Sequence, residues 1–128
     1  MPSTTIAPPF EAYKGSDPYA FVSYAHADGH LVFPDITSLR QMGVNIWYDE
    51  GIDPGNEWPE EIAEALDRSS LFICYVTPRS VVSRNCRNEV HFALNRNKVF
   101  IAIHLEETEL PKGLALRMGD LQAVMKHR

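Results

Sequence analysis

Short runs of apolar and strand-forming residues recur along the chain, and segments of helical length separate them. The runs are continuous rather than alternating, which is typical of strands buried on both faces of a sheet. Four clear runs cover residues 19–24, 44–48, 71–76 and 99–103, and residues 121–125 form a candidate fifth. The segments between them, at 28–42, 59–68 and 83–97, space their apolar residues as amphipathic helices do.

This alternation predicts an α/β fold with a central parallel sheet of four to five strands and helices on both faces. The first helix leaves two possibilities, because Pro34 falls inside its pattern. Either Asp28 caps a distorted opening turn, or the regular helix begins at Pro34. We expect a flexible lead-in over residues 1–18, rich in proline, and one domain over 19–128. No helical pattern follows the last strand, so we expect the final helix to be absent by truncation.

The composition of the chain argues against some classes of function. The 128 residues carry 12 Lys and Arg against 17 Asp and Glu, a net charge of −5, with no basic run. This balance disfavours binding to nucleic acid phosphates. Cys74 and Cys86 fall in a predicted buried strand and a helix, which suits reduced thiols and a cytoplasmic protein. No apolar stretch approaches the ~18 residues that a membrane span requires, so we expect no membrane association.

Glu89 occupies an unusual position on the third predicted helix. It lies at the edge of a stripe of apolar and small residues formed by Cys86, Val90, Ala93 and Leu94. A carboxylate directed toward the protein body is costly to desolvate, which makes Glu89 a candidate for chemistry. The alternative is a boundary glutamate that pairs with Arg96 or Arg84, or that extends to water.

The loops that follow the first three strands define the expected site. Ligands bind open parallel sheets outside the carboxyl ends of the strands, where strand order reverses. Residues 23–28, 49–58 and 77–80 should therefore converge, with Glu89 beneath them. The second loop contains two glycines and a proline and is long enough to close over a ligand.

Several familiar chemistries do not fit. The chain has neither G-x-G-x-x-G nor a phosphate-binding G-x-x-x-x-G-K-[ST]. A phosphoacceptor receiver needs acids where this chain has Ser23-Tyr24 and Thr77. We expect Cys86 to be a small core residue rather than a nucleophile. The histidines lack metal-ligand spacing, so we predict surface or loop positions and no metal for His26, His30, His91, His104 and His127.

Taken together, these segments resemble the Toll/interleukin-1 receptor (TIR) domain in its bacterial form. The similarity extends over about residues 19–126. It rests on an opening box at 20–28, a second strand and BB loop at 43–50 with Ile52, Gly55 and Trp58, a helix at 83–94, and the segment 106–111.

The resemblance implies a flavodoxin-like sheet and an NAD+ glycohydrolase (NADase) that cleaves the nicotinamide–ribose bond, with NAD+ as substrate and no metal. Glu89 becomes the expected catalytic residue, because it ends the family pattern S-x-x-C-x-x-E at Ser83, Cys86 and Glu89. Asn85 departs from the tryptophan that is frequent at its position. The expected contacts to the dinucleotide are Tyr24, His26, Asp53, Gly55 and Trp58.

The resemblance leaves several alternatives open. Glu89 can stabilise a ribosyl cation, accept hydrogen bonds from the ribose, or trap the sugar covalently, and the product can be linear or cyclic ADP-ribose. TIR domains also act as non-catalytic scaffolds that self-associate through the BB loop and neighbouring helices, many do both, and some interfere with host immunity. We expect activation by self-assembly in antiphage defence, with a sensor or oligomerisation partner on the same chain or another.

Overall fold

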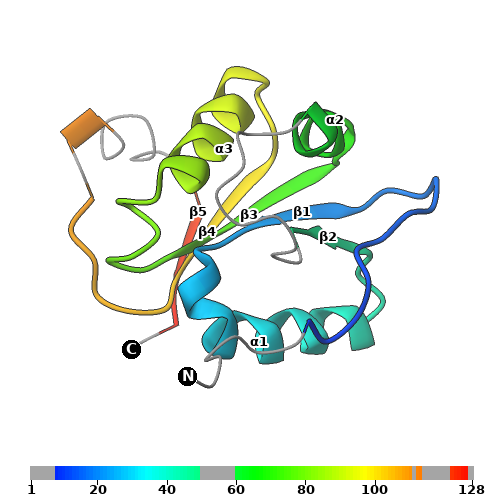
Figure 1. The fold of residues 1–128 in the computed structure, drawn as a ribbon, viewed down its shortest axis with the longest axis horizontal. Coiled ribbons are helices and arrows are strands. Elements are labelled where there is room, and N and C mark those ends of the chain that lie inside the picture. The colour runs from blue at the N-terminus through cyan, green and yellow to red at the C-terminus, as the bar shows by residue number, and fades with distance from the viewer. Residues whose placement is uncertain (1–7, 50–59, 111, 114–121, 127–128) are drawn as a thin grey trace, which may run out of the picture.

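A computed structural model describes residues 8–49, 60–110, 112–113 and 122–126 (Figure 1). Strands and helices alternate along the chain, as the pattern of apolar runs predicts. The elements are β1 (Ala20–Ser23), a 3₁₀ turn η1 (His26–Asp28), α1 (Gly29–Gln41), β2 (Ile46–Tyr48), α2 (Glu60–Arg68), β3 (Leu71–Val76), α3 (Arg84–Asn95), β4 (Phe100–His104) and β5 (Gln122–Met125).

The strands form one parallel sheet in the order β2-β1-β3-β4-β5. The chain moves outward from β1 to β2 and then crosses back to build β3, β4 and β5 on the other side. Strand order therefore reverses between β1 and β3, whose register pairs Ser23 with Cys74 at the carboxyl ends. This is the point at which open α/β sheets bind ligands.

Helices cover both faces of the sheet, which confirms the three-layer flavodoxin-like arrangement (Figure 1). Helix α1 packs on one face through Val32, Phe33 and Ile36, against residues such as Val22 and Ile73. Helices α2 and α3 pack on the other face. That second core joins Ile62, Leu66, Val90 and Ala93 to Phe21, Phe72 and Phe100 of the strands.

The start of α1 matches neither expectation in full. The helix begins at Gly29, directly after η1, and runs through Pro34. Asp28 occupies the N-cap position, but its side chain makes no capping hydrogen bond. Pro34 cannot donate to the carbonyl of His30, and both residues are exposed, so water can satisfy that carbonyl. The helix therefore tolerates the proline without starting at it.

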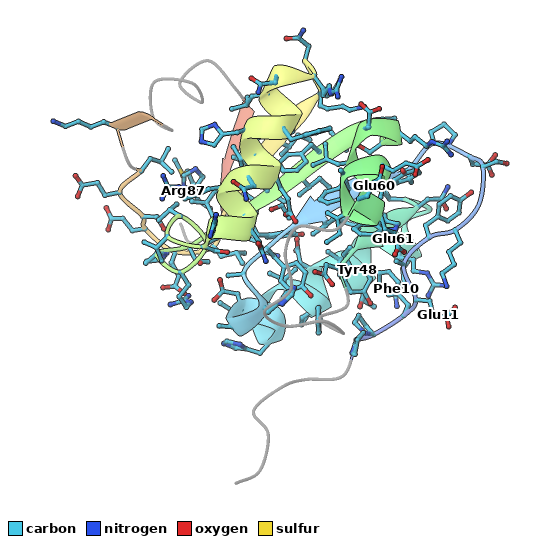
Figure 2. The ribbon with its side chains drawn as sticks, turned by 45° about the horizontal axis from the view of Figure 1, so that its top comes forward. Phe10, Glu11, Tyr48, Glu60, Glu61 and Arg87 are labelled. Carbon is cyan, nitrogen blue, oxygen red and sulfur yellow. The ribbon has the colours of Figure 1, made fainter. Side chains whose placement is uncertain are left out.

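The described part of the lead-in packs against the edge strand β2. The Tyr13 amide donates to the Ile46 carbonyl at 2.8 Å. The ring of Phe10 lies 5.2 Å from that of Tyr48, edge to face, and the two residues lie side by side in Figure 2. Ala12 is buried. This segment covers part of an edge that would otherwise offer unpaired backbone groups, while the domain boundary at residue 18 stays a prediction.

The structure also bears on the expectations for His104 and for the two cysteines. His104 was expected at the surface or in a loop, and this is wrong. It ends β4, is buried, and pairs in register with Val76 of β3 and Met125 of β5, so strands on both sides cover it. Cys74 and Cys86 are both buried, and neither forms a disulfide.

Among the described residues, no helix is long and apolar enough to cross a membrane.

Candidate active site

Helix α3 directs Glu89 at the sheet. Ser83 caps the helix by accepting a hydrogen bond from the Cys86 amide at 3.3 Å. The helical spacing then turns Cys86, Glu89 and Val90 inward, and Glu89 is only 6% exposed. The carboxylate does not extend to water. Arg96 was one partner that the sequence offered for Glu89, and its Nε instead lies 3.5 Å from Asp67 Oδ1.

Ser23 on β1 meets Glu89 from the sheet. Its hydroxyl donates to Glu89 Oε1 at 2.6 Å, and Ser23 itself is 1% exposed. Successive strand residues face opposite sides, so Ser23 shares the face of Phe21, toward α2 and α3. Sequence reasoning missed this contact. The available signal was a hydroxyl that closes an otherwise apolar strand, because a buried hydroxyl needs a partner.

Glu89 lines a cavity of about 200 Å³ at the carboxyl edge of the sheet. Its walls come from the end of β1 and the turn after it, from the residue after β2, and from the start of α3. The lining residues are Val22, Tyr24, Ala25, His26, Asp49, Ser83, Asn85, Cys86 and Glu89. The loop after β1 and Asp49, the first residue after β2, thus meet the start of α3 at the carboxyl edge of the sheet, where the sequence predicts the site.

Asp49 links the two predicted contact residues of the first loop. Its carbonyl accepts a hydrogen bond from the Tyr24 hydroxyl at 2.7 Å, and its carboxylate lies 3.5 Å from His26 Nε2. The bond to Asp49 raises the pKa of His26 above its ordinary value, although burial opposes the rise. Burial raises the pKa of Tyr24 so far that the phenol stays neutral. The cavity wall therefore holds a neutral phenol beside an imidazole.

Cys86 is buried on α3, as expected for a small core residue, and also borders the cavity. Burial raises the pKa of its thiol to about 11, and the charge of Glu89 adds to the rise. Side-chain hydrogen bonds with Ser83 and Ser23 oppose it less strongly. A thiol with this pKa is protonated at neutral pH, so Cys86 is not equipped to act as a nucleophile.

A second buried acid stands at the same edge of the sheet. Asp28 is 1% exposed, and its Oδ2 accepts a hydrogen bond from the Thr77 hydroxyl at 2.6 Å. Arg79 forms ion pairs with Asp28 and with Glu106. Helix capping by Asp28 was one of two possibilities that the sequence left open, and its side-chain partners Thr77 and Arg79 come from the loop after β3, with Glu106 after β4 pairing with Arg79. These contacts tie three loops together around the strand ends.

The structure thus brings Glu89, Tyr24 and His26 together at one cavity, with Asn85 also on its wall. Asp53, Gly55 and Trp58 lie outside the described residues, and their expected contacts stay predictions. Within the part of the chain that the structure describes, no three His, Cys, Asp or Glu side chains gather as metal ligands do.

The fold and the cavity define a flavodoxin-like α/β domain with a buried glutamate at its topological switch point. A family model for the TIR domain matches residues 20–127, and the chain therefore belongs to the TIR domain family. No curated protein matches the sequence.

Solved TIR domains share the fold. The TIR domain of the Toll-related receptor TRR-2 from Hydra magnipapillata is 21% identical, with a TM-score of 0.66 over 81% of this chain and 82% of that one. The TIR domains of the activated Roq1 resistosome, which directly recognises the pathogen effector XopQ, are 14% identical. Their TM-score is 0.60, over 80% of this chain and 64% of that chain.

Proposed function

We propose that this TIR domain cleaves the nicotinamide–ribose bond of NAD+, with Glu89 as the catalytic residue. The observation that carries the proposal is the position of Glu89. A buried carboxylate, held by a serine hydroxyl, lines a cavity at the switch point of the sheet. Burying a carboxylate is costly, and buried carboxylates are common at functional sites, where their charge takes part in the chemistry.

The chemistry requires little more than a placed negative charge. When the bond breaks, its electron pair moves onto the cationic nicotinamide ring and neutralises it, so the leaving group needs no proton. Positive charge develops on the ribose, and a fixed carboxylate stabilises that charge most strongly in the transition state. Water then adds to the ribose and loses a proton to give ADP-ribose, whereas attack by an adenine nitrogen gives a cyclic isomer.

The size of the cavity suggests which part of NAD+ it holds. Pockets that enclose a whole drug-sized ligand measure about 300–1,000 Å³, and this one measures about 200 Å³. It suits the nicotinamide and its ribose, with Tyr24 and His26 as polar and aromatic neighbours. Asn85 cannot supply the stacking of a tryptophan, worth about 1–3 kcal/mol for an aromatic ring on a base. We therefore expect weak binding of NAD+ by the isolated domain.

We further propose that self-association completes the site. The ADP part of the substrate needs contacts outside the cavity, and a second TIR domain placed through the BB loop can supply them. A solved structure with the same fold is that of TIR domains in a resistosome, which is consistent with assembly. The proposed setting, antiphage defence in a bacterium with a sensor as activator, rests on the family resemblance alone.

The test is nicotinamide release from NAD+ by the wild type and Glu89→Ala across protein concentration, with a crowding agent. We expect release by the wild type that rises steeply with concentration and disappears in Glu89→Ala. Glu107→Ala, which removes an exposed carboxylate after β4, is the matched control and should behave as the wild type. Absence of release from folded, concentrated wild type would favour a scaffold instead.

A further inference from the structure

Ser23 places a hydroxyl in a face of the sheet that is otherwise apolar near it. Phe21 precedes it on the same face, and Cys74 stands beside it in register on β3. Ser23 and Glu89 are both buried, so their hydrogen bond of 2.6 Å exchanges little with water. A hydrogen bond to an ionised partner in such surroundings is about twice as strong as one between neutral groups.

We propose that Ser23 is a positioning residue that fixes the Glu89 carboxylate at the cavity wall and keeps it ionised. The inference deepens the proposed function and rests on it. Ser23 belongs to a rigid central strand, whereas Glu89 has three rotatable bonds on a helix. One oxygen held by the sheet restricts how the carboxylate turns, and catalysis by a fixed charge depends on that restriction.

Four ionisable side chains among the described residues interact with Glu89, and their charge states bear on the role of Ser23. Tyr24 from the end of β1 and Cys74 from β3 act on Glu89 electrostatically, as do Cys86 from α3 and His26 from η1. Burial raises the pKa of Tyr24, Cys74 and Cys86, so all three are neutral near pH 7. His26 is the cation of this set when protonated, and Asp49 balances it. The Ser23 hydroxyl does not titrate near neutral pH, and it also hydrogen-bonds with the Cys86 side chain.

The first test follows the titration of Glu89 itself, through the ¹³C shift of its side-chain carboxyl carbon. Ser23→Ala removes the donor to the charged form, so the titration midpoint should move to higher pH. Ser23→Thr keeps a hydroxyl and should restore the wild-type midpoint. Ser69→Ala is the matched control, because Ser69 is also buried but donates to the Leu66 carbonyl at the end of α2. An unchanged midpoint in folded Ser23→Ala would overturn the proposal.

The second test uses steady-state kinetics with NAD+. Ser23→Ala should lower kcat about tenfold, the loss expected for one charge-assisted hydrogen bond, with KM little changed. In Ser23→Ala, the acidic limb of the plot of kcat against pH should move to higher pH by the same amount as the titration midpoint of the Glu89 carboxyl group. Equal losses of kcat in Ser23→Ala and Ser69→Ala would show that the role of Ser23 is only structural. If the wild type released no nicotinamide, the proposed function would fail, while the titration would still decide whether Ser23 controls Glu89.

Discussion

Two buried carboxylates lie at the same edge of the sheet, and their surroundings differ. Asp28 is 1% exposed and forms an ion pair with Arg79, which reaches on to Glu106. Glu89 is 6% exposed, accepts a hydrogen bond from the neutral Ser23 hydroxyl, and lines the cavity. Asp28 connects loops that are far apart in sequence, whereas Glu89 faces space that a ligand can occupy.

From this difference we infer that Asp28 stabilises the fold and that Glu89 serves the proposed reaction. A carboxylate whose charge is balanced by arginine has little left to offer a cationic transition state, because its field is already compensated. A neutral donor such as the Ser23 hydroxyl holds a carboxylate in place without adding an opposite charge. We therefore expect changes around Asp28 to affect stability, and changes around Glu89 to affect turnover.

The largest expected effect on stability comes from Arg79→Met. It leaves the Asp28 carboxylate buried without its cation, and breaking a buried pair in this way costs about 3–5 kcal/mol. Arg79 is 42% exposed, so solvent screening reduces the expected loss to about 2 kcal/mol. Urea denaturation measures it. Arg68→Met, which breaks the exposed pair between Arg68 and Glu64 on α2, should cost under about 0.5 kcal/mol, and equal losses would contradict a structural role for Asp28.

Asp28→Asn should cost less, about 1 kcal/mol. It removes the buried charge together with the ion pair, and the half-exposed Arg79 keeps its pair with Glu106 and its access to water. The same denaturation experiment measures the effect, and the double variant gives the coupling energy. A coupling near zero would show that the Asp28–Arg79 pair does not contribute to the fold.

A smaller effect concerns His26 and pH. Its pKa is raised in the folded state, chiefly by the bond to Asp49, so the pair stabilises the fold fully below the ordinary value of about 6.5. That contribution is lost as pH rises through the folded pKa. Both side chains are partly exposed, so we expect about 0.5 kcal/mol at most. The difference in unfolding free energy between wild type and Asp49→Asn should therefore shrink from pH 6 to pH 9. A difference that grows with pH would reverse the assignment.

The smallest expected effect is on Cys86. With a pKa of about 11, its thiol should resist alkylation by iodoacetamide in the native protein at pH 8 and react after unfolding. Mass spectrometry of the peptide that contains Cys86 follows the modification. Rapid native alkylation that stops turnover would return Cys86 to the list of candidate nucleophiles.

The sequence predicted the layers and the position of Glu89, because hydrophobic spacing reports which face of an element is buried. It predicted Tyr24 and His26 at the cavity for a similar reason, since the carboxyl ends of parallel strands share one edge. It did not predict that Ser23 meets Glu89, or that Asp28 pairs with Arg79. Spacing identifies a buried face but not the side chain opposite it on another element, and Asp28 fitted a helix cap equally well.

The most direct test of the account is nicotinamide release by Glu89→Gln, measured on protein whose unfolding midpoint is known. Glutamine keeps the shape and can still accept the hydrogen bond from Ser23, so only the charge is removed. We predict a loss of about a thousandfold in turnover, the scale of removing one key electrostatic group, with stability changed by under about 1 kcal/mol. Folded Glu89→Gln with turnover close to the wild type would contradict the central claim that the charge of Glu89 drives the reaction.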